Sequence, residues 1–304
     1  MRLMITGGSG LLALNWAVSC RDDHDILLLT HTKCVTLSGV TSLKVDLENK
    51  EELDDIIGQW RPDIIVHTAG MTNVDECDEF PERAYYTNVD LVKTMSLIAK
   101  KYSIKFVYIS SDHIFSGNKS FNTENDKTDT LNVYADSKLL GEKAAESVNK
   151  NCLIIRTNFF GWGTSVKPSF SDWVINTIRN REEIKAYTDI FYTPIFIYHL
   201  VDIAIKLIKK DCNGVFNIVG DSRISKYEFI LSLADRFELD TSLIKKSIYD
   251  SKGSNVKRPL DMSLSNALVK KTLRVDFPDL GQSFDELRLQ EESGIRSEIQ
   301  NCLT

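Results

Sequence analysis

The chain has 304 residues, 42% of them hydrophobic and 26% charged, which is the balance of a soluble globular protein large enough for two lobes. Its net charge of −6 argues against a nucleic-acid partner, because such proteins carry an excess of Lys and Arg, but is compatible with an anionic small molecule. No apolar run approaches the roughly 20 residues that span a bilayer, and no signal peptide precedes the first strand pattern, so we expect a cytoplasmic protein without a membrane partner.

Short apolar runs alternate with amphipathic segments through the first half of the chain, as in βαβ units around a parallel sheet. The apolar runs are nearly continuous in Val, Ile and Leu, which is typical of strands buried on both faces. We expect strands at 2–6, 25–30, 42–47, 63–70, 105–111, 152–159 and 214–220. We expect helices at 11–20, 49–60 and 82–102, around Tyr134, and at 170–180, 197–210 and 226–239.

The alternation becomes less regular after Gly161, and one more strand at 214–220 returns to the sheet. This pattern predicts an α/β fold, a doubly wound parallel Rossmann sheet with a small interleaved C-terminal substrate lobe. The predicted dinucleotide-binding domain comprises 1–161 and 196–220. The predicted substrate-binding lobe comprises 162–195 and 221–304.

The stretch "ITGGSGLLA" follows the first strand and opens the first helix. Gly7 and Gly10 leave room for a pyrophosphate to approach the backbone, and the small Ala13 permits close packing of the helix on the sheet. The first helical residues, Leu11 and Leu12, offer unpaired N–H groups and the positive end of the helix dipole. The position of this turn between strand and helix predicts a dinucleotide site.

The end of the second strand indicates which dinucleotide is bound. An acidic residue about 20 residues after the glycine turn would hold the ribose of NAD, but the chain has "THTK" at 30–33. No carboxylate repels a 2′-phosphate here, and His31 or Lys33 can attract one. The sequence therefore favours NADP(H) over NAD(H).

Tyr134 lies four residues before Lys138 on a predicted helix, so the phenol and the ammonium share one helix face. A nearby cation lowers the pKa of a phenol and favours proton transfer. About one Tyr-x-x-x-Lys is expected by chance in a chain with ten tyrosines, so the pair gains meaning only from its context. That context is Ser111, which ends the fifth strand at the carboxyl edge, where ligands bind in open α/β sheets.

The glycine turn, the serine after strand five and Tyr-x-x-x-Lys, in this order, resemble the extended short-chain dehydrogenase/reductase superfamily. Four segments resemble more closely its dTDP-4-dehydrorhamnose reductase (RmlD-like) group of sugar-nucleotide reductases. They are "HTAGMTNVDECDEFPERAYYTNV" (67–89), "SSDHIFSG" (110–117), "RTNFFGWG" (156–163) and "KRPLDMSLSNAL" (257–268).

The resemblance implies a catalytic triad of Ser111, Tyr134 and Lys138. In this interpretation Ser111 binds the substrate carbonyl, and Tyr134 donates a proton to it as hydride arrives from the nicotinamide. Lys138 holds the nicotinamide ribose and lowers the pKa of the tyrosine. Asn88 either supports the lysine or a relay water, or has a capping or packing role.

The resemblance also implies the residues that bind the two ligands. Those expected around the adenosine and the phosphates are Asp46, Leu47, Ala69 and Gly70. Those expected near the nucleotide sugar are Thr72, His113, Phe159 and Arg258. Family members usually have Tyr in place of His113 and often Trp in place of Phe159, so the resemblance does not define the sugar. The alternative roles are a core residue for Phe159 and a surface ion-pair residue for Arg258.

The resulting hypothesis is an NADPH-dependent oxidoreductase that reduces the 4-keto group of a nucleotide-linked 4-keto-6-deoxy sugar, as in polysaccharide biosynthesis, with a homodimer as the candidate assembly. A dehydratase needs Asp-Glu after the serine, whereas Ser111 is followed by Asp112 and His113. A 4-epimerase and a non-catalytic NADP-binding regulatory subunit remain alternatives. The five histidines show no metal-ligand spacing, and the six scattered cysteines indicate free thiols.

Overall fold

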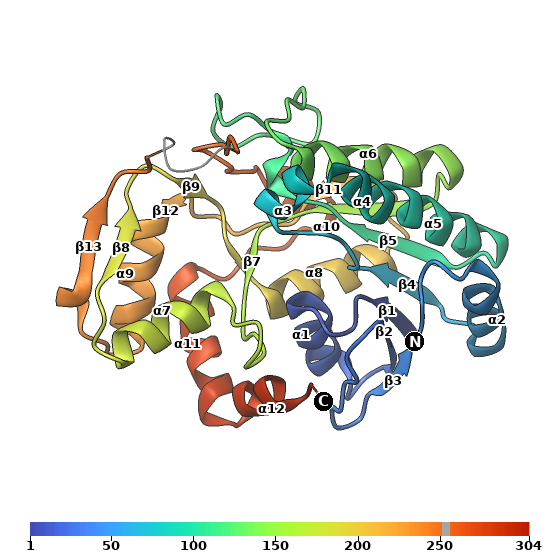
Figure 1. The fold of residues 1–304 in the computed structure, drawn as a ribbon, viewed down its shortest axis with the longest axis horizontal. Coiled ribbons are helices and arrows are strands. Elements are labelled where there is room, and N and C mark those ends of the chain that lie inside the picture. The colour runs from blue at the N-terminus through green and yellow to red at the C-terminus, as the bar shows by residue number, and fades with distance from the viewer. Residues whose placement is uncertain (251–255, 304) are drawn as a thin grey trace.

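A computed structural model of the protein describes residues 1–250 and 256–303. Its centre is a seven-stranded sheet in the order β11-β6-β5-β4-β1-β2-β3, in which every neighbouring pair is parallel (Figure 1). The strands are β1 (Arg2–Thr6), β2 (Asp25–Thr30), β3 (Thr41–Lys44), β4 (Ile64–His67), β5 (Lys105–Ile109), β6 (Cys152–Arg156) and β11 (Gly214–Asn217). The predicted doubly wound parallel sheet is confirmed, and its order reverses between β1 and β4.

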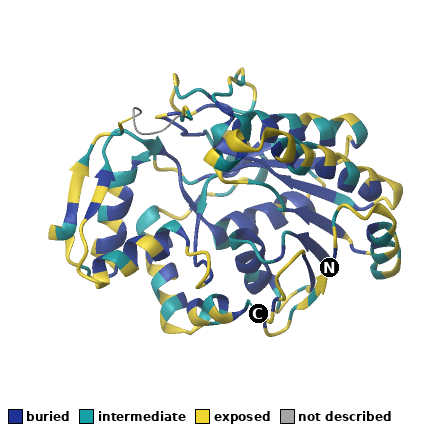
Figure 2. Ribbon diagram, viewed as in Figure 1, coloured by how far each residue is buried: buried dark blue, intermediate teal, exposed yellow. Residues whose placement is uncertain are grey.

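Helices cover both faces of the sheet. One face packs against α1 (Leu11–Cys20) and α8 (Ile197–Lys209), and the other against α2 (Lys50–Trp60), α5 (Leu91–Lys101) and α6 (Val133–Val148). Successive residues of one strand enter different cores, since side chains alternate across a sheet. The inner strands β1, β2, β4, β5 and β6 are therefore almost wholly buried (Figure 2), as their continuous apolar sequences predict, whereas the edge strand β3 is largely exposed.

The predicted helices of the first half are present, with one irregularity. Asn49 caps α2 by accepting a hydrogen bond from the backbone N–H of Glu52 at 3.2 Å. The expected helix at 82–102 consists of α4 (Pro81–Tyr85), a π-helical turn (Tyr86–Asp90) and α5. This turn contains the buried Asn88, whose contacts are described below.

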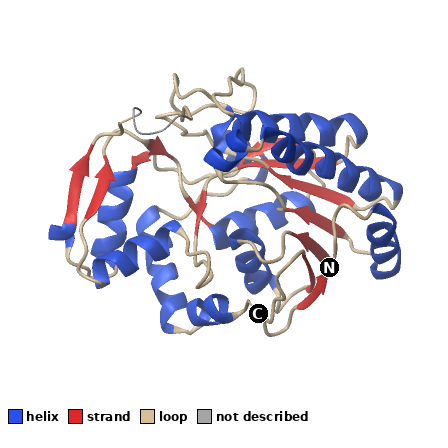
Figure 3. Cartoon of the chain, viewed as in Figure 1, coloured by secondary structure: helices blue, strands red, loops and turns tan. Residues whose placement is uncertain are grey.

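A second group of elements lies beside the carboxyl edge of the sheet (Figure 3). Its helices are α7 (Phe170–Arg179), α9 (Lys226–Arg236) and α11 (Leu280–Glu292). Its strands pair as β8 (Ile184–Tyr187) with β13 (Ile244–Ser247), and as β9 (Phe191–Tyr192) with β12 (Ile224–Ser225). The sequence predicts α7 and α9 but not these short strands, whose partners are distant along the chain.

Six further short elements of the described chain lie between these, among them the 3-10 turns Asp112–Ile114 and Thr241–Leu243. Between the two groups, β7 (Phe159–Phe160) pairs with β10 (Ile195–Phe196). The helix α3 (Val74–Glu79) follows β4, and α10 (Ala267–Leu273) packs near β11.

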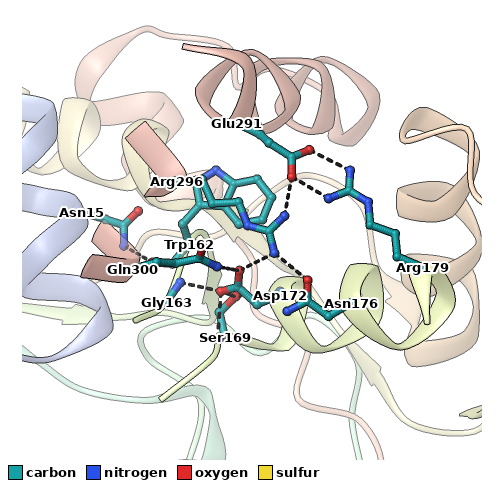
Figure 4. A network of polar contacts seen from close by, with 10 residues as sticks. All are labelled: Asn15, Trp162, Gly163, Ser169, Asp172, Asn176, Arg179, Glu291, Arg296 and Gln300. Carbon is teal, nitrogen blue, oxygen red and sulfur yellow. Dashed lines mark hydrogen bonds and ion pairs between the residues drawn. The ribbon is translucent and has the colours of Figure 1, made fainter. Parts of the chain in front are cut away.

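The last helix, α12 (Ile295–Asn301), connects the two groups. Its Arg296 pairs with Glu291 and with Asp172 of α7, and its guanidinium lies 4.4 Å from the ring centroid of Trp162 (Figure 4). In the other direction, Glu298 accepts two hydrogen bonds from Arg21, at 2.5 and 2.9 Å. The end of the chain thus contacts both groups of elements. The boundaries predicted for the substrate lobe stay a prediction.

Candidate active site

The glycine turn between β1 and α1 lies against the end of β4. Gly7 has a φ of +67°, and a Cβ at this position would stand 2.8 Å from the backbone nitrogen of Ala69. No other residue type fits this combination of conformation and close approach. The turn closes with a hydrogen bond from the N–H of Gly10 to the carbonyl oxygen of Gly7, at 2.8 Å. Because no side chain caps α1, the N–H groups of its first turn face the crevice between β1 and β4.

The other predicted cofactor residues lie along the same edge of the sheet. His31 and Lys33 are exposed in the loop after β2. Asp46 is also exposed, and its Oδ1 accepts a hydrogen bond from the N–H of Glu48 at 2.9 Å, while Leu47 is half-buried. A nucleotide extending from the glycine turn across β2 and β3 would meet all four side chains.

Ser111 follows β5 and is buried. Its Oγ accepts a hydrogen bond from the N–H of His113 at 3.2 Å and donates one to Oδ1 of Asp112 at 3.3 Å. The Ser111 side chain is near enough to Tyr134 to lower the pKa of its phenol, so these two triad residues lie close together although they belong to different elements. The edge of the His113 ring packs on the Tyr134 ring at a centroid distance of 5.5 Å.

Tyr134 is the second residue of α6, whose N-cap Asn132 accepts a hydrogen bond from the N–H of Ala135 at 2.9 Å. Burial raises the pKa of Tyr134 to about 12, and the hydrogen bond with Ser111 lowers it by less. The sequence predicts a pKa lowered by Lys138, and this prediction is wrong for the protein without ligands. The reason is that the loss of water around the phenol outweighs the effect of any neighbouring charge.

Lys138 is buried one helical turn after Tyr134. Its Nζ donates a hydrogen bond to the carbonyl oxygen of Ile109 at 2.7 Å and lies 4.3 Å from the ring centroid of Tyr108. Burial lowers the pKa of Lys138 to about 7, while the negative charge of Glu142 raises it by less. The Nζ would stand 3.9 Å from a Cβ at Gly70, so the lysine borders the crevice where the dinucleotide is expected.

Asn88 joins the loop after β4 to α6. Its Oδ1 accepts the N–H of Met71 and its Nδ2 donates to the carbonyl oxygen of Met71, each at 2.9 Å. The same Nδ2 donates to Oγ of Ser137 at 2.9 Å. These contacts give Asn88 a packing role, and its support of the lysine or of a relay water stays a prediction.

Of the four predicted sugar-binding residues, His113 contacts Tyr134, and the other three lie in other segments of the chain. Thr72 is exposed beside α3, and Phe159 is half-buried in β7, where it packs against the main core. Arg258 donates from Nη2 to Oδ2 of Asp75 at 2.7 Å, which is the ion pair that the sequence offers as its alternative role. Its Nε is buried without a partner among the described residues.

A buried ion pair behind the triad is not predicted by the sequence. Arg156, at the end of β6, donates from Nη2 to Oε2 of Glu142 at 2.7 Å, and Ser110 donates to Oε1 of Glu142 at 2.5 Å. Glu142 lies one turn after Lys138 on the same face of α6, and this spacing is the only sequence signal for it. The pair fixes α6 against the carboxyl ends of β5 and β6.

The described residues contain no candidate metal cluster and no membrane-spanning helix. Within 1–250 and 256–303, no group of three or more His, Cys, Asp or Glu side chains is placed to hold a metal ion. None of the described helices is long and apolar enough to cross a membrane. All six cysteines are free thiols, as the sequence predicts.

The family model "RmlD substrate binding domain" matches residues 1–288. The chain belongs to this family. A crystal structure of a hypothetical dTDP-4-dehydrorhamnose reductase from Sulfolobus tokodaii is 31% identical, with a TM-score of 0.80, and the match covers 92% of this chain and 97% of the other. A probable low-salt glycan biosynthesis reductase of Haloferax volcanii is 25% identical over 92% of this chain and 95% of its own length.

A further solved structure of the RmlD type resembles the chain in fold. It is a dTDP-4-dehydrorhamnose reductase from Bacillus anthracis in complex with NADP, with a TM-score of 0.84 and 21% identity, and the match covers 95% of this chain and 99% of that one. The Rossmann fold and the RmlD-like resemblance drawn from the sequence are thus confirmed over nearly the whole chain.

Proposed function

We propose that the protein is an NADPH-dependent reductase that converts the 4-keto group of a nucleotide-linked 4-keto-6-deoxy sugar to a hydroxyl group. The observation that carries this proposal is the grouping of the three triad residues: Ser111 lies near enough to Tyr134 to lower the pKa of its phenol, and Lys138 is buried one helical turn later, with its Nζ 3.9 Å from a Cβ placed at Gly70. The named relatives are reductases, and the Bacillus anthracis structure holds NADP, which supports the same assignment.

The residues present fit a dinucleotide. The glycine turn packs closely on the loop after β4, because a Cβ at Gly7 would collide with Ala69 and one at Gly70 would stand 2.9 Å from Oδ1 of Asn88. At Gly10, a Cβ would meet only the carbonyl oxygen of Gly7 within 4 Å, so there is space beside the start of α1. The N–H groups at Gly10, Leu11 and Leu12 would hold the pyrophosphate. The groups that would hold the rest of the cofactor are Asp46, Leu47, Ala69 and Lys138, together with His31 and Lys33.

A bound nicotinamide would supply hydride to the carbonyl carbon of the sugar. Tyr134, whose pKa of about 12 keeps it protonated at neutral pH, would donate its phenolic proton to the carbonyl oxygen. Ser111 would hydrogen-bond the same oxygen as negative charge develops on it. The buried Lys138 would hold the nicotinamide ribose, and its charge would stabilise the phenolate that remains on Tyr134.

The first experiment is to measure oxidation of NADPH by the purified protein with freshly prepared dTDP-4-keto-6-deoxyglucose, alone and with a 3,5-epimerase. Oxidation establishes a reductase, and dependence on the epimerase identifies the accepted sugar. Interconversion of C4 epimers without net NADPH oxidation would replace the proposal with the 4-epimerase. Tight NADPH binding without turnover of dTDP, UDP and GDP sugars would replace it with the regulatory subunit.

The preference for NADPH depends on Lys33 in this proposal. Lys33→Ala should weaken NADPH binding by about tenfold, because one exposed charge-assisted contact with the 2′-phosphate is lost, and should leave NADH binding nearly unchanged. Equilibrium titration by nicotinamide fluorescence measures both affinities. Lys44→Ala, at the exposed end of β3, is the matched control. Equal weakening of both cofactors by Lys33→Ala would reject this role for Lys33.

A further inference from the structure

Lys226 belongs to the second group of elements and lies near enough to Asp112 for their charges to interact. It is the first residue of α9, and its Nζ lies 3.6 Å from the ring centroid of Tyr192 and 4.7 Å from that of Phe170. Burial lowers the pKa of Lys226 to about 8, and the charge of Asp112 opposes this shift. Across the described part of the chain, no carboxylate forms a direct ion pair with Lys226 and no oxygen accepts a hydrogen bond from it.

Asp112 follows Ser111 in the sequence and is 2% exposed. Its Oδ1 accepts a hydrogen bond from Ser111 at 3.3 Å, and its Oδ2 accepts one from Nδ2 of Asn158 at 2.6 Å. A carboxylate oxygen has room for a second hydrogen bond, so Asp112 keeps free accepting capacity. The carboxylate is thus held one residue away from the hydroxyl group that would bind the reacting ketone.

Two further polar atoms near this pair lack partners. The hydroxyl of Tyr192, a residue 2% exposed, and Nδ1 of His113 are both buried without a hydrogen-bond partner in the described residues. The charge of Asp112 is close enough to raise the pKa of both Tyr192 and Tyr134, and that of Lys226 is close enough to lower the pKa of His113. Buried polar atoms are normally paired, so these unpaired atoms, one in the ring that contacts Tyr134 and one in the ring that contacts Lys226, indicate the place of a polar ligand.

We propose that Lys226 and Asp112 together bind the C3 hydroxyl group of the sugar, on the carbon next to the reacting ketone. Lys226 donates a hydrogen bond to the hydroxyl oxygen, and Asp112 accepts a hydrogen bond from the hydroxyl O–H. This inference rests on the proposed function for the position of the ketone, and it adds to that function a residue of the substrate lobe that selects the sugar.

The charges of the pair define the group that they accept. A carboxylate substituent would be repelled by Asp112 and an ammonium by Lys226, whereas a hydroxyl group donates to one and accepts from the other. In a pyranose with its ketone at C4, the neighbouring atoms are C3 and C5. Only C3 carries a free hydroxyl group, because C5 is bonded to the ring oxygen and C6. The pair therefore selects a neutral 4-keto sugar with its C3 hydroxyl intact.

The test compares two substrates, the 4-keto-6-deoxy sugar nucleotide and its 3-deoxy analogue. The wild-type protein should favour the 3-hydroxy sugar about 10- to 100-fold in kcat/KM, the range of a charge-assisted hydrogen bond. In Lys226→Met this ratio should fall toward one. Lys226→Arg, which keeps a donor and a positive charge, should restore part of the preference. The same ratio after Lys226→Met as in the wild type would overturn the proposal.

Lys246→Met is the matched control. Lys246 belongs to β13, and its Nζ also lies over an aromatic ring, 5.1 Å from the centroid of Tyr227. Both changes remove a lysine ammonium that lies over an aromatic ring in the second group of elements. An effect due only to lost stability or to a lost aromatic contact would therefore appear in both variants. The preference for the 3-hydroxy sugar should be unchanged in Lys246→Met, and its loss there would overturn a specific role for Lys226.

Binding separates this proposal from the proposed function. The affinities of the NADP+-loaded protein for the 4-hydroxy sugar nucleotide and for its 3-deoxy counterpart are measured by calorimetry, without turnover. If no NADPH is oxidised but the wild type binds the 3-hydroxy sugar more tightly and Lys226→Met does not, only the proposed function fails. If turnover occurs and the wild type does not distinguish the two sugars, the role of Lys226 and Asp112 fails alone.

Discussion

Replacing Tyr134 by Phe should lower kcat for NADPH oxidation by about 10²–10⁴-fold, the usual contribution of a positioned general acid. The variant keeps the ring that packs against His113 and removes only the hydroxyl group that contacts Ser111. Binding of NADPH should change little, because the hydroxyl group faces the substrate carbonyl in the proposed mechanism. Stopped-flow measurement of hydride transfer separates the chemical step from product release.

Tyr198→Phe is a close control for this experiment. Burial raises the pKa of Tyr198 to about 12, as it does for Tyr134, and the hydroxyl group of Tyr198 has no partner among the described residues. The two variants therefore lose the same atom from similar surroundings, but only one loses it beside Ser111. Turnover retained by Tyr134→Phe, or lost equally in both variants, would show that Tyr134 is not the proton donor.

The second large effect should come from the ion pair behind the triad. Arg156→Met leaves the buried carboxylate of Glu142 without its counter-charge and should reduce the free energy of unfolding by about 3–5 kcal/mol. This is a large part of the 5–15 kcal/mol typical of a folded domain, so the variant should unfold at clearly lower urea concentration. Glu142→Gln should have a similar cost, since it leaves the guanidinium of Arg156 uncompensated.

A double-mutant cycle tests whether the two side chains act as a unit. Glu142→Gln combined with Arg156→Met should cost less than the sum of the single changes, because the second change removes the charge that the first leaves unpaired. Lys206→Met provides the surface reference, since Lys206 pairs with Asp202 at 2.7 Å in an exposed position and should contribute less than about 1 kcal/mol. Strict additivity of the two buried changes would contradict the coupling.

The sequence predicts the sheet well because its strands are continuous apolar runs, a signal that is local. The expected and observed strands agree at Arg2–Thr6 and Asp25–Thr30, and elsewhere the expected strands extend past the observed ends. The expected strand at 105–111 is an example, since β5 ends at Ile109 and Ser111 already belongs to the loop. The residues beyond the strand ends form the site, and there the backbone follows tertiary contacts rather than strand periodicity.

The substrate side of the site could not be predicted to the same degree. Tyr134 and Lys138 share one helix, so their spacing alone brings them together. Lys226 lies near Asp112 only because α9 packs beside the carboxyl edge of the sheet, and no local sequence pattern indicates this proximity. The predicted lowering of the Tyr134 pKa is wrong for a related reason, since the spacing reveals a neighbouring charge but not the depth of burial.

The contacts of α12 with both groups of elements can form only late in the synthesis of the chain. Arg21 and its partner Glu298 are 277 residues apart, so the ribosome has made nearly all the chain before this contact can form. Until then, the C-terminal end of α1 lacks this ion pair, and contacts this distant along the chain form slowly. During synthesis, this end of α1 should therefore stay accessible to chaperones until α12 has docked.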